Sequence, residues 1–600
     1  MKTNSREKHY FESRQIVPKK DRWQLEQLYK NITEWEKHYV QVGKKVQPLS
    51  RFKGRLQKPA VILEYFQKAS AVLRQIEKLY VFAGHLSATD LANHHAQVIA
   101  QKAQDLYSKF SQATSFLGPE LSRLKDDLLR QMAASKNFHE FHRELKLILA
   151  RKKHILSDGE EGLLSLYSRI FSGPEDIFSS LDNVDMTFAD VTDAKGKKWQ
   201  LTSGNFLKFL ENNDRRLREQ AFGNYYRSYQ SHIHTYGQTL NLCVKQHQVY
   251  AEAKKYAGCL EASLSSNMID GKIYHSLIEH THRALPVLHR YFALRAKKLG
   301  LKKLNMWDLR VSLAGSAPFH FTYDEAVEIC LKAVAPLGAE YVKIMAGGLR
   351  GGWVDKYENK GKRNGAFSGG CYDSLPFILM NFTGTLNDVF TLVHEAGHSM
   401  HSWFARHNQP FGLSDYALFT AEIASTVNER LLTIYLLQHY SGAKRQMIIE
   451  HEIDAIRATY FRQTMFAEFE LAIHREVEKG EPLTSQFFNQ LYAKLNAKYH
   501  GPAVGQDQYI QFEWARIPHF YYNFYVYQYA TGIAAAYYFA EQITAPNEGK
   551  KAAEMYLNFL KAGGNDFPLK QLSRAGLNFL RPDLYHAVAK NLEKCLNLLT

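Results

Sequence analysis

The sequence predicts a mainly α-helical protein with one short β segment, and three observations favour this class. Apolar residues recur at intervals of three and four through residues 22–150, with short loops between the runs, as in amphipathic helices. The same spacing resumes through residues 214–300. Residues 345–385 differ, because they are rich in Gly and end in an apolar run typical of a strand.

The N-terminal helical pattern gives way near residue 200. Residues 183–206 alternate in polarity around Asp-Ala-Lys-Gly, which predicts a hairpin. We therefore place a loose boundary there, between an N-terminal helical lobe (1–200) and a larger C-terminal domain (201–600). Because no linker or repeat marks the boundary, we expect the two lobes to interleave along the chain.

Composition and cysteine usage indicate a soluble protein of a reducing compartment. The 600 residues are 23% charged and 45% hydrophobic, which is a globular balance. No apolar run approaches the ~18 residues of a membrane span, and the first residues lack the apolar core of a secretory signal. The five cysteines are odd in number, scattered and without a CxxC pair. We expect a cytoplasmic protein without a membrane partner; the sequence does not indicate its oligomeric state.

The formal net charge is +16, which a nucleic-acid-binding protein could also carry. The basic residues, however, are dispersed among acidic ones and form only short clusters. This distribution is typical of a solvated basic surface, and we expect no stable nucleic-acid partner.

The sequence LNDVFTLVHEAGHSMHSWF predicts a metal-binding helix. His394 and His398 lie four residues apart, on one side of a helix, where both imidazoles can hold one ion. Glu395 points about 100° around the helix, where it can reach a water molecule beside the ion without being a ligand. Opposite the histidines lies an apolar stripe that would pack in the core. HExxH on a helix is typical of zinc hydrolases, so we expect one Zn²⁺ per chain.

A third ligand is expected in TAEIASTVNERLL. Position 404, where one class of zinc peptidases has a third His, is Phe, and His401 comes too early for that pattern. Glu422 lies on a helical segment with a small, polar face, and we predict it as the ligand. Glu429 shares that face and is expected to accept a hydrogen bond from a ligand His. His401, on the histidine side of its helix, is a second residue expected beside the ligands.

A short apolar strand precedes the metal-binding helix. An extended peptide could pair with the backbone of this run, which carries Phe377, Leu379 and Asn381. A purely structural sheet explains the same residues equally well, and the sequence leaves both interpretations open.

An aromatic segment, RIPHFYYNFYVYQYATG, predicts a helix that begins at Pro518. His519, Tyr522 and Tyr529 would share one face of it, with Tyr525 at the edge. Such residues are often core, yet Tyr O–H and His N–H can also stabilise an oxyanion. Because the register after His519 can be aligned in more than one way, Tyr525 is kept as a reserve candidate.

These motifs together resemble the M3 family of zinc metallopeptidases, specifically its oligoendopeptidase F branch. The resemblance extends over residues 145–535 and includes RKKHILSDGEEGLL, KGKRNGAFSGG and LPFILMNFTGT. It implies two mainly helical lobes around a deep channel, with the small sheet beside the zinc helix. It also implies endopeptidase activity on short unfolded peptides, with His519 and the tyrosines as oxyanion donors. MWDLR at 306–310 departs from the usual Tyr-containing version, which leaves local substrate contacts open.

Three alternatives remain at this point. A metallocarboxypeptidase or dipeptidyl carboxypeptidase would use the same chemistry at the C-terminus of its substrate. A catalytically silent peptide-binding protein would need no general base, so Glu395 argues against it. A basic nucleic-acid-binding protein would bind DNA or RNA in a salt-sensitive manner.

Overall fold

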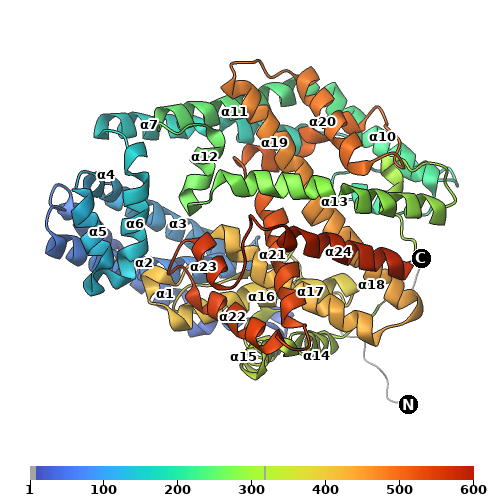
Figure 1. The fold of residues 1–600 in the computed structure, drawn as a ribbon. Helices are drawn as coiled ribbons and strands as arrows, with labels where there is room; N and C mark the ends of the chain where they lie inside the picture. The colour runs from blue at the N-terminus through green and yellow to red at the C-terminus, as the bar shows by residue number, and fades with distance from the viewer. Residues whose placement is uncertain (1–8, 316–318, 600) are drawn as a thin grey trace, which may run out of the picture. The chain divides into compact units, whose positions relative to one another are not determined.

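The computed structural model describes residues 9–315 and 319–599, and it confirms the mainly α-helical class (Figure 1). The chain divides into two compact units, each built from three separated segments. Unit 1 contains Met1–Ser157, Pro318–Gln438 and Phe539–Leu577, and unit 2 contains Asp158–Ala317, His439–Tyr538 and Asn578–Thr600. Residue 200 falls inside unit 2, and the loose boundary expected there stays a prediction.

Unit 1 is organised around paired helices. The N-terminal part of the unit has six helices among the described residues, in the order α1 (Ile32–Val46), α2 (Pro59–Thr89), α3 (His94–Thr114), α4 (Leu117–Ser122), α5 (Asp126–Ala134) and α6 (His142–Arg151). The later segments add α14 (Tyr323–Ala333), α15 (Ala339–Arg350), α16 (Leu386–Asn408), α17 (Leu418–His439), α22 (Gly549–Ala562) and α23 (Pro568–Arg574).

The strands of unit 1 are short. β1 (Tyr10–Phe11) pairs in parallel with β5 (Glu358–Asn359). A three-stranded sheet has the order β4-β7-β6, with β4 (Val354–Asp355) parallel and β6 (Phe367–Gly369) antiparallel to β7 (Phe377–Leu379). β7 is fully buried, and it packs in one core cluster with residues of α1 and α2 such as Trp35 and Ile76.

The predicted pairing of a peptide with the strand at residues 377–382 is therefore wrong for β7. Both of its edges are already hydrogen-bonded, and the Phe377 and Leu379 side chains are 0% exposed. Sequence periodicity does not distinguish a central strand from an edge strand when the run is short and wholly apolar. Within the described residues, the outer strand on one side of this sheet is β6.

A buried lysine fixes the Gly-rich segment that contains β4, β5 and β6. Lys362 is 6% exposed, and its Nζ donates to the carbonyl oxygens of Tyr357 at 2.7 Å and Met380 at 2.6 Å. The same ammonium lies 2.7 Å from the buried carboxylate of Asp355. Because a buried charge is stable only when it is paired and hydrogen-bonded, this network holds a segment with little regular structure in one conformation.

Unit 2 is also helical. Its first segment contains α7 (Asp158–Phe171), α8 (Gly173–Ser180), α9 (Phe206–Leu210), α10 (Arg215–Ser231), α11 (Ile233–Ala253), α12 (Cys259–Leu264) and α13 (Gly271–Lys298). The later segments add α18 (Gly442–Ala455), α19 (Arg462–Glu478), α20 (Ser485–His500), α21 (Tyr527–Ile543) and α24 (Pro582–Leu599). The last residues of α21 belong to the third segment of unit 1. β2 (Val191–Thr192) pairs antiparallel with β3 (Lys198–Trp199), which confirms the predicted hairpin.

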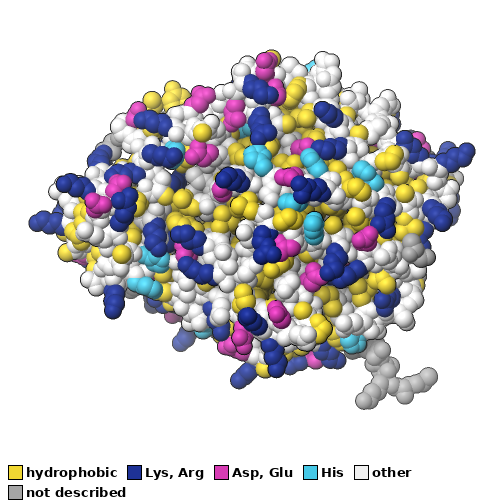
Figure 2. Space-filling model, viewed as in Figure 1, with side chains coloured by type: hydrophobic (Ala, Val, Ile, Leu, Met, Phe, Trp, Pro, Cys, Tyr) yellow, Lys and Arg dark blue, Asp and Glu magenta, His cyan; other side chains and the backbone are white. Residues whose placement is uncertain are grey.

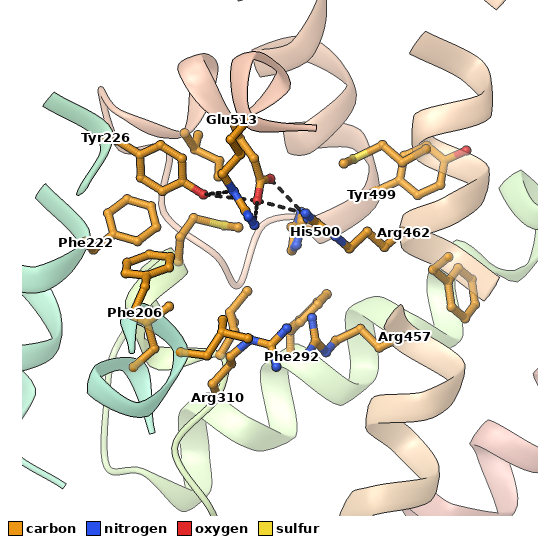
Figure 3. A pocket seen from close by; sticks show the side chains of 18 of the residues that line it. Phe206, Phe222, Tyr226, Phe292, Arg310, Arg457, Arg462, Tyr499, His500 and Glu513 are labelled. Carbon is orange, nitrogen blue, oxygen red and sulfur yellow. Dashed lines mark hydrogen bonds and ion pairs between the residues drawn. The ribbon is translucent and has the colours of Figure 1, made fainter. Parts of the chain in front are cut away.

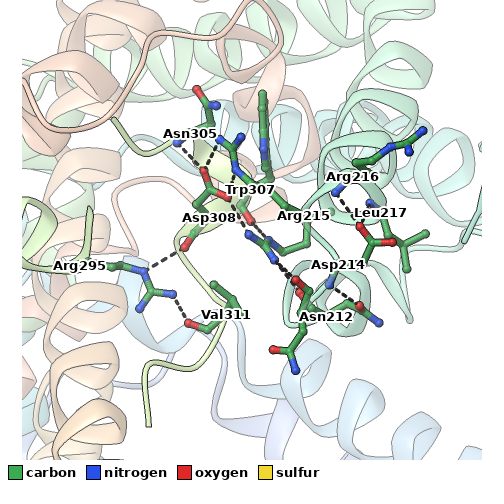
Figure 4. Close-up of polar contacts among 12 residues, drawn as sticks. Asn212, Asp214, Arg215, Arg216, Leu217, Arg295, Asn305, Trp307, Asp308 and Val311 are labelled. Atoms are coloured by element: carbon green, nitrogen blue, oxygen red, sulfur yellow. Dashed lines mark hydrogen bonds and ion pairs between the residues drawn. The ribbon is translucent and has the colours of Figure 1, made fainter. Parts of the chain in front are cut away.

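The unusual MWDLR sequence has a structural role in unit 2. Asp308 is 0% exposed, and it accepts hydrogen bonds from Arg215 at 3.0 and 2.9 Å and from Arg218 at 2.9 Å (Figure 4). Although burial opposes ionisation, these hydrogen bonds lower the pKa of the Asp308 carboxyl. The Arg295 guanidinium donates to the Asp308 carbonyl at 3.0 Å. Asp308 therefore joins α10 and α13 within this unit.

The exposed charges are mixed in sign. Figure 2 shows Lys and Arg interspersed with Asp and Glu over the visible face, as the dispersed sequence pattern predicts. All five cysteines are buried and free. Within the described residues, every helix is either too short or too polar to span a lipid bilayer.

Candidate metal centre

The helix that carries HExxH has a well-defined start. Thr385 and Asp388 form a capping box, in which the Thr385 hydroxyl accepts from Asp388 N at 3.2 Å and the Asp388 carboxylate accepts from Thr385 N at 2.9 Å. The carboxylate also accepts from Thr383 N at 3.0 Å. The predicted position of Asp388 in the first turn is confirmed, and it complements the helix dipole.

The predicted apolar stripe of α16 is buried in unit 1. Its members are all 2% exposed or less, namely Val389, Val393, Ala396, Met400 and Phe404. The helix packs on α14, α15 and α22 and on the sheet strands β6 and β7. Ser368 of β6 and Ser399 of α16 share a hydrogen bond of 2.8 Å between their hydroxyl groups. The core thus fixes the rotation of α16 and the direction of its opposite, histidine-bearing side.

Three predicted ligands converge on one point. The Nε2 atoms of His394 and His398 each lie 3.5 Å from Oε2 of Glu422. One ligand atom from each of the three side chains falls within 4.8 Å of the others, and no other set of His, Cys, Asp or Glu among the described residues has this geometry. Two imidazoles and a carboxylate are the donor set of a catalytic zinc site, so these residues fit a zinc ion.

Glu429 orients the first of these ligands, as predicted. Its Oε1 lies 2.6 Å from His394 Nδ1, a hydrogen bond in which the imidazole N–H donates. This bond leaves Nε2 as the free donor atom for a metal. Burial alone would lower the pKa of His394, but the hydrogen bond to Glu429 and nearby carboxylates raise it to about 9. Burial likewise opposes the charge on Glu422, while the hydrogen bond with His398 lowers its pKa to about 2.

Glu395 lies next to the first ligand but outside the ligand group. Its side chain is 7% exposed, and burial raises the pKa of its carboxyl, while the neighbouring His394 and His398 oppose that rise. A carboxylate with a raised pKa and no metal bond is suited to accepting and returning a proton near neutral pH.

Two residues that support the centre were not predicted from the sequence. A Cβ at Gly397 would lie 2.5 Å from Ser425 Cα and 2.7 Å from the Ala424 carbonyl oxygen, so only Gly allows α16 to approach α17 this closely. Asn428 of α17 donates to the Val393 carbonyl at 3.2 Å and accepts from the Tyr341 hydroxyl at 3.0 Å. The available signal was Gly397 itself. Gly inside a helix costs about 1 kcal/mol relative to Ala, so its presence there indicates a packing or functional requirement.

The structure does not bring His401 to a ligand. Its ring is 1% exposed and stacks on Tyr416 with 3.6 Å between the ring centroids. Neither ring nitrogen has a hydrogen-bond partner among the described residues, and burial lowers the pKa of the imidazole to about 3. His401 is thus a neutral core residue, and it forms no hydrogen bond that could orient a ligand. A helical projection places a residue on one side of its own helix but does not show what packs there.

Asn381 supports a neighbouring loop. Its amide nitrogen donates to the carbonyl oxygens of Arg363 at 3.0 Å and Gly365 at 2.9 Å, so the donor side of the amide is used within unit 1. Its predicted role in substrate binding gains no support from these contacts.

His519 and the candidate tyrosines form an aromatic cluster in unit 2. The single helix predicted from Pro518 is wrong, because a 3₁₀ turn (Pro518–Tyr521) ends before Asn523 and Phe524, which have φ of 45° and 59°. Left-handed residues interrupt a helix, and α21 begins only at Tyr527. The chain reversal nevertheless places the rings of Tyr522, Tyr525 and Tyr529 within 5.6, 6.0 and 5.9 Å of the His519 ring.

A helix carrying two histidine ligands, an intervening buried glutamate and a third acidic ligand from the next helix defines a metallopeptidase site. Comparison with known proteins specifies the family. The model of Peptidase family M3 matches residues 208–587, and that of Oligopeptidase F matches residues 120–188. The chain belongs to peptidase family M3 and is a metallo-oligopeptidase.

Several relatives match nearly the whole chain. Oligopeptidase PepF of Bacillus subtilis is 41% identical over 97% of this chain and 87% of its own length. Group B oligopeptidase PepB of Streptococcus agalactiae is 40% identical over 98% and 97%. The crystal structure of oligoendopeptidase-F from Enterococcus faecium is 35% identical, covers 94% of this chain and 98% of its own, and superposes with a TM-score of 0.74. The non-enzymatic alternatives are therefore set aside.

Proposed function

We propose that the protein is a zinc-dependent endopeptidase that hydrolyses internal bonds of short, unfolded peptides. The convergence of His394, His398 and Glu422 beside the buried Glu395 is the observation that carries this proposal. The names of the relatives, oligopeptidase and oligoendopeptidase, support the substrate class. The free cysteines support a cytoplasmic location, since disulfides are rare in reducing compartments.

The proposed chemistry divides the work between the ion and Glu395. Zinc held by His394, His398 and Glu422 would polarise the scissile carbonyl and lower the pKa of water to about 7. Glu395 takes the proton of the attacking water on its carboxylate and returns it to the leaving amine. Burial of Glu395 favours its protonated form and so helps it to hold the proton between the two steps. Glu429 keeps His394 in the tautomer that presents Nε2.

Two further roles belong to the proposal. Imidazole and phenol donors of His519, Tyr522, Tyr525 and Tyr529 stabilise the oxyanion of the tetrahedral intermediate. The substrate backbone pairs with β6 rather than β7, because β6 is an outer strand and its Ser368 is hydrogen-bonded to the metal-binding helix.

Substitution of the base and of a ligand separates catalysis from metal binding. Glu395→Gln should keep one zinc per chain and lower kcat on a quenched peptide by about 10²–10⁴-fold, the usual contribution of a general acid–base. Glu422→Ala should lower the zinc content itself. Glu340→Gln, an exposed substitution on α15, is the matched control and should leave both quantities unchanged. Near wild-type turnover by Glu395→Gln would show that another group moves the proton.

Product analysis distinguishes the endopeptidase from a carboxypeptidase or dipeptidyl carboxypeptidase. A peptide of about ten residues with an acetylated N-terminus and an amidated C-terminus should be cut internally, and a chelator should abolish the cleavage. If only peptides with a free C-terminal carboxylate are cleaved, and one or two residues are released, the carboxypeptidase alternative is correct.

A further inference from the structure

Unit 2 contains a partly open cavity of about 70 Å³ whose wall carries four arginines, three of which are labelled in Figure 3. Arg310 is the last residue of MWDLR, Arg457 and Arg462 lie at the junction of α18 and α19, and Arg516 ends the 3₁₀ segment Ile510–Arg516. The remaining wall is largely aromatic and aliphatic. By the usual measure a single water molecule needs about 10–15 Å³, so this volume admits a small ion with some water.

Two of the four arginines are neutralised by one buried carboxylate. Glu513 is 4% exposed and accepts from Arg462 at 3.0 and 3.1 Å and from Arg516 at 3.1 Å. It also accepts from the Tyr492 hydroxyl at 2.5 Å. The Tyr226 hydroxyl donates to it as well, at 3.1 Å. With these five donor contacts, the Glu513 carboxylate is fully engaged and has no capacity for the other arginines.

The other two arginines lack such a partner. Arg457 is 8% exposed, and its Nε donates to Asp454 at 3.0 Å, but its Nη2 is buried without a hydrogen-bond partner. Arg310 is only partly buried, and its guanidinium forms no hydrogen bond or ion pair with any residue that the structure describes. Burial and the adjacent charge of Arg457 lower the pKa of Arg310. Four guanidinium groups thus face three carboxylates, namely Glu513, Asp454 and, near Arg310, Glu211. This leaves a formal surplus of one positive charge. His500, which also lines the cavity, adds none at neutral pH, because burial lowers its pKa to about 4.

From this geometry we propose that the cavity is a binding site for one small inorganic anion, held by Arg457 Nη2 and Arg310. Buried guanidinium groups are stable when their fork-shaped donors meet a halide or an oxyanion such as phosphate. The cavity is too small for a nucleotide or a peptide. Its anion would stabilise unit 2, including the segment from Arg516 to His519, independently of whether the chain hydrolyses peptides.

Thermal unfolding of the full-length protein at constant ionic strength tests the site. Chloride, phosphate and sulfate are compared with gluconate, which exceeds the cavity. At least one small anion should raise the unfolding temperature of the wild type by a few degrees, with a saturable concentration dependence, because a ligand that binds only the folded state stabilises it. The order among the three anions identifies whether a halide or an oxyanion is preferred.

Two variants make the result specific. Arg457→Met and Arg310→Met should each reduce the anion-dependent shift by at least half, whereas Arg283→Met, an exposed residue of α13 paired with Glu279, should keep it. Arg310→Met guards against misfolding of Arg457→Met, since its loss breaks no hydrogen bond or ion pair with a described residue. Equal effects of gluconate and small anions, or full shifts in both cavity variants, would overturn the proposal and leave a water-filled cavity.

Discussion

Replacing Gly397 by Ala tests whether the close approach of α16 to α17 sets the affinity for the metal. The new Cβ would lie 2.5 Å from Ser425 Cα and 2.7 Å from the Ala424 carbonyl oxygen, both backbone atoms that cannot rotate away. The helices must therefore separate, and Glu422, three residues before Ser425, moves with α17. Because Glu422 supplies one of three ligand atoms that lie within 4.8 Å of one another, this separation weakens the site.

The magnitude follows from two opposing effects. Overpacking a buried contact costs about 1–3 kcal/mol, whereas Ala in place of Gly within a helix gains up to about 1 kcal/mol. If the overpacking strain falls on the ligand geometry, the dissociation constant for zinc should rise about 5- to 150-fold, at 1.4 kcal/mol for each tenfold change. The helix-propensity gain is shared by the metal-free and metal-bound states and does not offset this loss.

A competition titration of zinc against a fluorescent chelator measures the change. Gly347→Ala is the matched control, because Gly347 also lies within a helix, α15, and a Cβ there would meet no atom within 4 Å. The control should keep the zinc affinity and melt at an equal or slightly higher temperature. If Gly397→Ala binds zinc as tightly as Gly347→Ala, the helix spacing does not govern the site and the reasoning fails.

Three other predictions follow from the buried charges and rings. At pH 7.5 the metal-free His394, with its pKa raised to about 9, carries a proton that zinc must displace, so the affinity for zinc should rise with pH up to about 9. Glu429→Gln should lower the number of protons released on zinc binding, measured by calorimetry in buffers of different ionisation enthalpy. Burial raises the pKa of the Glu470 carboxyl, which accepts from Phe524 N, to about 8. Because the folded protein binds this proton more tightly than the unfolded chain, the stability from that group is present at low pH and is lost as pH rises through about 8. Glu470→Gln should therefore flatten the dependence of melting temperature on pH between 5 and 8. His401→Phe should retain wild-type zinc affinity, since a residue that positioned a ligand would lower it about 10–100-fold when replaced.

The parts of the centre that depend on one helix were predictable. Spacing of four between His394 and His398, an apolar stripe and an acidic residue in the first turn specify α16 without tertiary information. Glu422 was also predicted, because a small polar face on an otherwise apolar helix indicates a packed functional site. Each of these signals lies within about 20 residues of sequence and follows from helical geometry alone.

What could not be predicted depends on contacts between distant segments. Whether β7 is an outer or a central strand is decided by β4 and β6, which flank it only in the fold. His401 shares a side with the ligands in projection, but Tyr416 covers it. Of the left-handed residues Asn523 and Phe524, Asn adopts this conformation more often than most residues but Phe does not, so the sequence gives only a weak indication of a reversal.

The interleaved composition of unit 1 has a consequence for biosynthesis. α16 packs against α22, so the metal-bearing helix acquires the neighbour that covers this part of its surface only after most of the polypeptide has left the ribosome. Until then that surface is available to chaperones or to other nascent chains. Shortening the gene from its 3′ end as far as α22 should therefore yield insoluble protein, even though every zinc ligand would still be encoded.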